Sequence, residues 1–186
     1  MSREIEAKLK IDSLDSVENA LKRLKAEFVE NQFQRDYYYF PVKPVIQSQR
    51  PLRLRYQRAE AGQRNYLTYK GKKQDSKFKK RIELELEIDD IEKAGALLNA
   101  IGYEQGLAFE KKRQYWKYFD CQVFLDELPL IGFFVEIEGV DEARIARVQL
   151  DMGLAGCDHI NKGYSAMIIE KLADMGIAEK EVYFSG

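Results

Sequence analysis

The sequence predicts an α+β protein, mainly antiparallel β, in which eight strands close into a barrel tunnel with amphipathic helices packed outside. Three observations support this prediction. Apolar and ionic residues alternate along most strands, two β-α-β-β-β halves follow one another, and the ionic faces carry too many charges for a dry core. Eight strands is a number that suits a closed barrel. The opening stretch REIEAKLKI shows the alternation, with Ile5, Ala7 and Leu9 on one face and ionic residues on the other.

The first half begins with this strand, at residues 3–12, and an amphipathic helix follows at 13–28. Asp12 or Ser13 is available to cap the helix, because either side chain can accept hydrogen bonds from free backbone N–H groups. The apolar residues of the helix recur at helical spacing: Val17, Ala20, Leu21, Leu24 and Phe28. Three more strands are expected at 33–40, 51–58 and 65–71.

The second half repeats this order. RIELELEID at residues 81–89 resembles REIEAKLKID at 3–12: both carry two glutamates two residues apart, end in Ile-Asp and run into an amphipathic helix. The alternative is a chance similarity between two amphipathic strands. The expected elements are a strand at 77–88, a helix at 89–102 and strands at 108–119, 122–128 and 133–139.

The chain is expected to form a single domain, 1–186, with the tunnel strands within 2–139. Two helices are predicted after the last strand, at 141–153 and 160–176. No linker or low-complexity tract separates these helices from the strands, so we expect them to pack on the same domain.

Composition limits the classes of partner. Lys plus Arg number 30 and Asp plus Glu 31, so no overall field attracts nucleic acid or an acidic membrane, and acidic strands argue further against a nucleic-acid partner. Cys121 and Cys157 lack the spacing of a zinc site or a disulfide framework, so a reducing cytoplasm is expected. His159 is the only histidine, which argues against a Ser-His-Asp triad. No apolar run reaches the roughly 18 residues of a membrane span. A homodimer is left open.

The ionic strand faces need an explanation of their own. A face exposed to water need only be polar, whereas here acidic pairs and basic pairs occupy separate strands. Because the helices require apolar surface outside, the ionic face is expected to line the tunnel. Desolvating so many charges costs several kcal/mol per ion unless they are paired, hydrated or bound to a ligand. The alternative is an ordinary solvated face.

The acidic and basic residues of the ionic strand faces together indicate the kind of ligand. Glu4 and Glu6 lie about 6.6 Å apart along their strand by the rise per residue, and Glu136 and Glu138 repeat this spacing. Such hard oxygen donors suit Mg²⁺ or Mn²⁺. The basic residues on the same face can surround a polyanion, and arginine grips phosphate oxygens with two donors: Lys8, Arg53, Arg55, Lys70, Arg81, Lys111 and Arg113. Together they predict a metal-polyphosphate site and chemistry at phosphorus.

Eight short motifs occur in order between residues 4 and 138. They are E-x-E-x-K (Glu4, Glu6, Lys8), D-x-Y-Y (Asp36, Tyr38, Tyr39), L-R-L-R (52–55), L-T-x-K-G (67–71), R-x-E-x-E (Arg81, Glu83, Glu85), E-K-x-R (110–113), L-D (125–126) and G-x-F-x-E-I-E (132–138). A late K-S-Y motif appears as Lys162, Gly163 and Tyr164. On these motifs the chain resembles the CYTH superfamily, or triphosphate tunnel metalloenzymes. The stretch KGKKQDSKFKKRIELE at 70–85, with Asp-Ser followed by basic residues, looks most like the small class IV adenylyl cyclase members of that superfamily.

The resemblance implies an eight-stranded antiparallel tunnel. It places divalent metal on Glu4, Glu6, Glu136 and Glu138 and the triphosphate on the basic residues. Catalytic or orienting roles are expected for Glu83, Glu85, Asp126, Lys162 and Tyr164. The expected reaction is either hydrolysis of a triphosphate or cyclisation of ATP to cyclic AMP and pyrophosphate, with ATP, thiamine triphosphate or tripolyphosphate as substrate. The alternative is a binding module for polyphosphate or nucleotide without catalysis.

Overall fold

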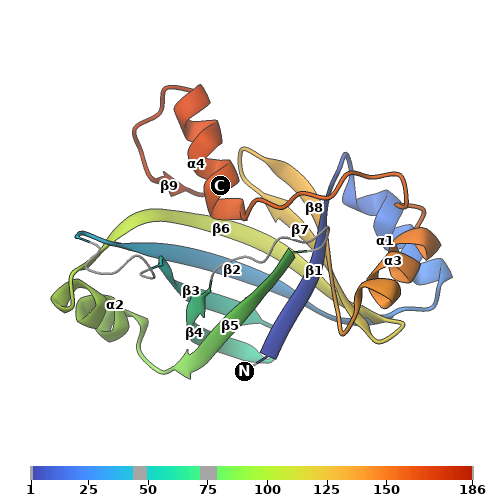
Figure 1. Ribbon diagram of the computed structural model, residues 1–186, viewed down its shortest axis with the longest axis horizontal. Coiled ribbons are helices and arrows are strands. Elements are labelled where there is room, and N and C mark those ends of the chain that lie inside the picture. Colours follow the sequence, from blue (N-terminus) through green and yellow to red (C-terminus); the bar gives the residue numbers. More distant parts are fainter. Residues whose placement is uncertain (1, 44–49, 72–78, 186) are drawn as a thin grey trace.

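The computed structural model describes residues 2–43, 50–71 and 79–185, and its side chains are described except at 2–4 and 79–81. The described residues form four helices and nine strands (Figure 1). In chain order these are β1 (Ser2–Ile11), α1 (Leu14–Arg23), β2 (Glu27–Pro41), β3 (Leu52–Ala59), β4 (Gly62–Lys70), β5 (Lys79–Ile88), α2 (Ile91–Ala100), β6 (Tyr103–Tyr118), β7 (Cys121–Leu128), β8 (Gly132–Gly139), α3 (Glu142–Asp151), α4 (Tyr164–Asp174) and β9 (Glu181–Val182).

The predicted α+β class with a mainly antiparallel sheet is confirmed, and so is the order of two β-α-β-β-β halves. The strands pair in the order β2-β3-β4-β5-β1-β8-β7-β6-β9, and β2 also pairs with β6. The pairings among β1 to β8 are antiparallel, whereas β9 joins β6 in parallel.

The two halves exchange their first strands. β5 lies beside β4 of the first half, and β1 lies beside β8 of the second. We call β2, β3, β4 and β5 the β2–β5 wall, and β1, β8, β7 and β6 the β1–β8 wall. The walls meet along β2 and β6, from Glu27 opposite Lys117 to Pro41 opposite Tyr103. They also meet along β1 and β5, where the described pairing runs only from Ser2 to Glu6 of β1.

Helix α1 is shorter than predicted. Ser13 caps it by accepting a hydrogen bond from the backbone N–H of Asp15, at 3.2 Å. Lys25 then adopts a φ of 56°, a left-handed conformation that ends the helix. The residues after it therefore enter β2, which starts at Glu27 rather than at 33. Phe28, expected on the helix, packs edge-on against Trp116 with ring centroids 4.9 Å apart.

Other boundaries also differ from the prediction. Helices α2 and α3 begin after Asp90 and Asp141, which cap them by accepting a hydrogen bond from the backbone N–H three residues later. Helix α4 begins at Tyr164 rather than at 160, and β6 begins at Tyr103 rather than at 108. The two-residue strand β9 had no predicted counterpart.

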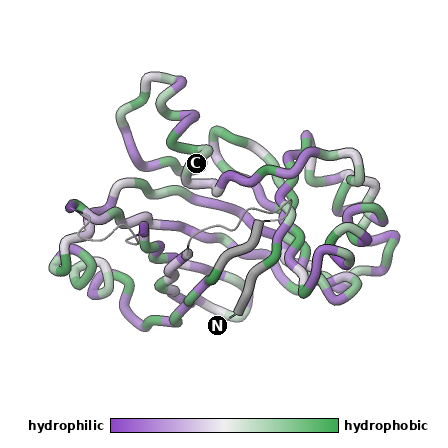
Figure 2. Tube along the Cα trace, viewed as in Figure 1, coloured by the Kyte–Doolittle hydropathy of each residue, from purple (hydrophilic) through white to green (hydrophobic). Residues whose placement is uncertain are grey.

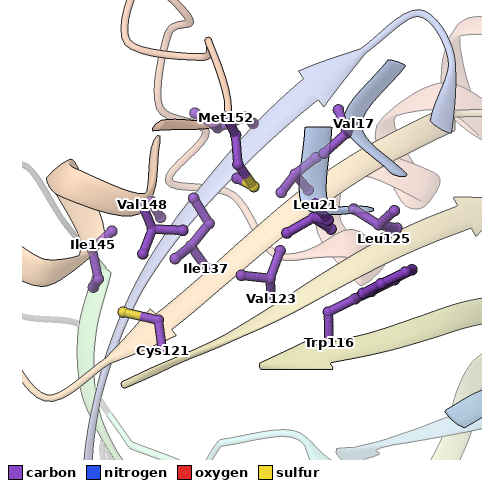
Figure 3. Close-up of a cluster of buried hydrophobic side chains, with 13 residues drawn as sticks. Val17, Leu21, Trp116, Cys121, Val123, Leu125, Ile137, Ile145, Val148 and Met152 are labelled. Atoms are coloured by element: carbon purple, nitrogen blue, oxygen red, sulfur yellow. The ribbon is translucent and has the colours of Figure 1, made fainter. Parts of the chain in front are cut away.

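Apolar side chains on the outer side of the sheet pack beneath three helices. The alternation of apolar and polar residues along the strands can be followed in Figure 2. Helices α1 and α3 cover the β1–β8 wall, where Val17, Leu21, Ile145 and Val148 meet the strand residues shown in Figure 3. Helix α2 covers β3 through Leu98 and its neighbours. The helices the structure describes include none that is long and apolar enough to cross a membrane.

Two expectations about the outer face are wrong. The outer side of β5 is not covered by a helix: Ile82 is 45% exposed and Leu86 65%. Helix α4 does not pack on the outer side either. Its Ile168 belongs to a cluster that includes Phe109 and Phe134. Phe109 lies two residues before Lys111 and Phe134 two residues before Glu136, so both share the face of the ionic residues. The fourth helix therefore covers part of the inner face.

Candidate functional site

A cavity of about 850 Å³ lies between the two walls. It is lined by ionic side chains from β1, β2, β3, β4, β5, β6 and β8, together with the start of α4. The predicted site residues among its lining are Glu6, Lys8, Arg53, Arg55, Lys70, Glu83, Glu85, Lys111, Arg113, Glu136, Glu138 and Tyr164. The ionic strand faces therefore surround a cavity, as the sequence predicts.

The carboxylates of the β1–β8 wall gather around one lysine. In the strand register, Glu6 lies opposite Glu138, and Lys8 lies opposite Glu136. The Lys8 Nζ is 3.1 Å from an oxygen of Glu136 and 3.8 Å from an oxygen of Glu6. Burial disfavours the ammonium, but Glu136 and Glu6 outweigh burial and raise the pKa of Lys8 above its ordinary value. Lys8 is thus a fixed cation among acids.

The same carboxylates fit a divalent cation by their chemistry. Glu6, Glu136 and Glu138 bring oxygen donors to one cavity from two neighbouring strands, and hard oxygen donors are the preferred ligands of Mg²⁺ and Mn²⁺. The side chain of Glu4 lies outside the described residues. Within residues 2–43, 50–71 and 79–185, no group of three or more acidic, histidine or cysteine side chains is already arranged to hold a metal.

Asp126 is the centre of a second cluster on this wall. Its carboxylate is fully buried and accepts two hydrogen bonds from Arg113, both at 2.6 Å. It also accepts one from the hydroxyl of Tyr164, at 2.8 Å, and lies 3.5 Å from the Lys111 Nζ. Arg113 contacts Glu136 as well. Asp126 therefore holds two cavity cations and the first residue of α4 in fixed positions.

Lys111 has an unusual environment. It is 2% exposed, and burial, followed by the neighbouring charge of Arg113, lowers the pKa of its amine to about 7. Asp126 acts in the opposite direction but does not restore the ordinary value. Near neutral pH the Lys111 amine therefore exchanges between its charged and neutral forms.

On the β2–β5 wall, Asp36 binds Arg55 through two hydrogen bonds, at 2.6 and 2.8 Å. Burial alone would raise the pKa of Asp36, but Arg55 and Arg53 outweigh it and hold that pKa well below its ordinary value. Asp36 therefore stays ionised. The sequence places Asp36 in the D-x-Y-Y motif but does not predict a site role for it. One feature of the sequence could have indicated a site role: Asp36 lies on the same face of the sheet as the ionic residues of the neighbouring strands.

The remaining cations of this wall are paired with the glutamates of β5. Arg53 donates to the hydroxyl of Thr68 at 3.0 Å and to Glu85 at 3.2 Å. The Lys70 Nζ lies 2.8 Å from Glu83. These contacts hold Arg53 and Lys70 beside the two glutamates. The side chain of Arg81 lies outside the described residues.

The side chain of Lys162, predicted to act in the site, does not contact the cavity. Its ammonium is directed away from the cavity and binds both oxygens of Glu170 at 2.8 Å. What reaches the site is its backbone carbonyl, which accepts a hydrogen bond from the Lys8 Nζ at 3.2 Å. The side chain points outward because the motif residue sits just before α4, whose first residue, Tyr164, turns inward.

Two aromatic residues that were not among the predicted site residues, Phe124 and Tyr38, also line the cavity. The ring of Phe124 lies 4.0 Å from the guanidinium carbon of Arg113 and stacks on Tyr115 with centroids 5.0 Å apart. Tyr38 lies at another part of the lining and stacks on Phe109. Such rings orient cations through their faces, but in the sequence they are indistinguishable from core residues.

Comparisons with known proteins identify the family of the chain. A family model described as the CYTH domain matches residues 2–147. A protein of Methanocaldococcus jannaschii named "Putative adenylate cyclase MJ0240" is 31% identical over 136 residues, which are 73% of this chain and 75% of that protein. The solved structure of the PH1819 protein from Pyrococcus horikoshii OT3 is 27% identical with a TM-score of 0.77, covering 90% of this chain and 99% of that one. A conserved hypothetical protein from Pyrococcus furiosus is 28% identical with a TM-score of 0.72, covering 87% and 97%. The chain belongs to the CYTH domain family.

Proposed function

We propose that the chain is a divalent-metal-dependent enzyme that acts on a triphosphate held in the cavity, with β1 to β8 closed around it as a tunnel. One observation carries this proposal: carboxylates from β1 and β8 and cations from β3, β4 and β6 line the same cavity. The pairing of β2 with β6 supports the tunnel. Because Tyr164 of α4 contacts Asp126, we further propose that residues 1–186 act as one domain.

Glu6, Glu136 and Glu138 would hold Mg²⁺ or Mn²⁺, with Glu4 as a further ligand. The bound metal polarises a phosphoryl group and stabilises the charge on the leaving oxygens. The chain's own contribution on this wall is the Lys8 ammonium, which places a positive charge 3.8 Å from an oxygen of Glu6 and 3.1 Å from an oxygen of Glu136.

The phosphate oxygens would be bound by the cations predicted from the sequence: Lys8, Arg53, Arg55, Lys70, Arg81, Lys111 and Arg113. Asp36 and Asp126 each occupy one side of an arginine with two hydrogen bonds. Because the aspartate already fixes the guanidinium, less side-chain freedom is lost when the triphosphate binds.

Two reactions share this arrangement. In hydrolysis, water attacks the triphosphate. In cyclisation of ATP, the ribose 3′-hydroxyl attacks the α-phosphorus, and cyclic AMP and pyrophosphate are the products. The similarity to a relative named as an adenylate cyclase favours including ATP among the first substrates.

The test is to incubate the protein with ATP, thiamine triphosphate and tripolyphosphate, each with Mg²⁺ and with Mn²⁺, and to identify the products. Cyclic AMP with pyrophosphate assigns a cyclase, whereas a diphosphate (or pyrophosphate) with orthophosphate assigns a hydrolase. Binding without any product would contradict the enzyme and leave a binding module. Absence of both binding and turnover would contradict the proposal as a whole.

A further inference from the structure

We propose that the C-terminal tail, residues 180–184, positions Lys8 and Lys111 in the cavity by holding α4 in place, and that Glu110 anchors this tail. The inference rests on the proposed function for the meaning of the two lysines. The contacts run in three steps, from β6 to the tail, from the tail to α4, and from α4 to the lysines.

The first step is the attachment of the tail to β6. The described pairing of β6 with β7 begins at Lys112, so the stretch before it presents an edge to the tail. There β9 pairs in parallel with Ala108 and Phe109, and the N–H of Ala108 donates to the carbonyl of Lys180 at 2.7 Å. An edge strand offers unpaired N–H and C=O groups for such an addition.

Glu110 provides the charged anchor. Its carboxylate is 6% exposed and accepts a hydrogen bond from the backbone N–H of Phe184 at 3.0 Å. Its other oxygen accepts from Arg35 at 2.6 Å, and the Arg35 guanidinium lies 4.7 Å from the ring of Tyr183. One buried carboxylate thus joins the tail to both β6 and β2. Such a charge is costly to bury unless both partners stay in place.

The second step joins the tail to α4. Val182 is 5% exposed and belongs to the same cluster as Ile168 and Leu172 of α4. This cluster also includes Phe109 and Phe134 from the inner face of the sheet. The tail and the helix therefore pack as one body on the inner face, and loosening the tail removes part of the surface that holds the helix.

The third step leads from α4 to the cavity. The Lys8 Nζ lies 4.0 Å from the ring centre of Tyr164, and the Lys111 Nζ lies 5.3 Å from it. The carbonyl of Lys162 accepts from Lys8, and the Tyr164 hydroxyl donates to Asp126. The start of α4 therefore contacts both lysines. Glu110 has no described contact with the cavity lysines, so it is a positioning residue that acts through the tail and α4.

The test compares Glu110→Ala and Glu110→Gln with the matched control Glu104→Ala, which changes an exposed glutamate on the same strand. The affinity for tripolyphosphate with Mg²⁺ is measured by calorimetry below the unfolding temperature of each variant. Glu110→Ala should bind roughly tenfold more weakly, because the anchor contacts are lost. Glu110→Gln, which keeps an acceptor, should lose less, and Glu104→Ala should stay within about twofold. Unchanged affinity in Glu110→Ala would overturn the proposal.

A merely structural role is distinguished by repeating Glu110→Ala in a background that carries both Lys8→Ala and Lys111→Ala. If the tail acts by positioning these two lysines, its effect should shrink to below about threefold, since sites that are coupled through a shared element are not additive. An equal loss in both backgrounds would contradict positioning. If the wild type does not bind triphosphate at all, the proposed function fails. Hydrogen exchange of α4 then decides separately: faster exchange in Glu110→Ala but not in Glu104→Ala supports the anchor, and unchanged exchange overturns it.

Discussion

The two walls carry the same kind of ion pair with the charges exchanged. The second and third strands of the first half join Asp36 of β2 to Arg55 of β3. The second and third strands of the second half join Arg113 of β6 to Asp126 of β7. Each pair is buried and bidentate. A repeated strand order thus places one rigid arginine on each side of the cavity.

The fourth strands of the two halves, β4 and β8, place residues of opposite charge in the cavity, and this difference separates the two walls. On the β1–β8 wall, Glu138 of β8 lies opposite Glu6. On the β2–β5 wall, Lys70 of β4 lies opposite Glu83 and binds it at 2.8 Å. One wall therefore brings carboxylates together where a cation can bind, whereas the other supplies its own cation. Under the proposed function, the β1–β8 wall would hold the metal, and the cations of both walls would bind the phosphate oxygens.

The largest effect is expected from Glu6→Gln, with Glu83→Gln as its counterpart on the other wall. Glu6→Gln should reduce turnover by at least roughly 100-fold, because a charged metal ligand is lost at the reacting phosphate. Glu83→Gln should cost less than about tenfold and leave the Mg²⁺ dependence unchanged. Initial rates at saturating Mg²⁺ measure both. Equal losses in the two variants would break the distinction between the walls.

A smaller effect is expected from Arg55→Ala and Arg113→Ala, one on each wall. Each should weaken triphosphate binding by about 1.5–3 kcal/mol through the loss of charge-assisted contacts. Each also removes the two hydrogen bonds that an arginine donates to a buried aspartate, which should lower the free energy of unfolding by up to about 3–5 kcal/mol. Calorimetry and denaturant titration separate the two losses. Arg147→Ala, which changes an exposed arginine of α3, is the control, and unaltered affinity in both cavity variants would remove the phosphate assignment.

The smallest effect concerns pH. With a pKa of about 7, Lys111 is mostly neutral at pH 8.5 in the empty protein. A bound polyanion favours the ammonium and raises this pKa, so binding should take up a proton and affinity should fall as pH rises from about 7 to 9. Calorimetry in buffers of different ionisation enthalpy measures the uptake. Lys111→Arg, which stays charged, should remove most of it, and equal uptake in that variant would exclude Lys111 as its source.

Much of this comparison could be predicted from sequence. The sequence predicts the ionic strand faces and the order of the two halves. The described site residues also lie on the predicted cavity side, except for the side chain of Lys162. Alternation along a strand fixes which residues share a face, and this is why the prediction succeeded for residues as far apart as Glu6 and Glu136.

Other features had no local signal. Alternation does not say which strands pair, so the exchange of β1 and β5 between the walls could not be predicted. The helix predicted at 13–28 is too long, and its last residues belong to β2. The turn that ends the helix is at Lys25, which has a left-handed conformation, but lysine is also a good helix former and so gives no stop signal in the sequence. The role of Asp36 depends on Arg55 across the sheet, and the tail strand β9 depends on where β7 stops. These features arise from tertiary contacts.

The central claim is that metal and triphosphate together neutralise the two walls, and the melting temperature tests it most directly. Binding to the folded state alone stabilises by about 2.7 kcal/mol at a hundredfold excess of ligand over Kd, which for a chain of this size is a rise of roughly 5–10 °C. Tripolyphosphate with Mg²⁺ should produce this rise. Orthophosphate with Mg²⁺ at equal concentration should not, because a single phosphate offers fewer charges and oxygens to the cations of the two walls. A melting temperature that stays unchanged throughout a saturating tripolyphosphate series would contradict the account.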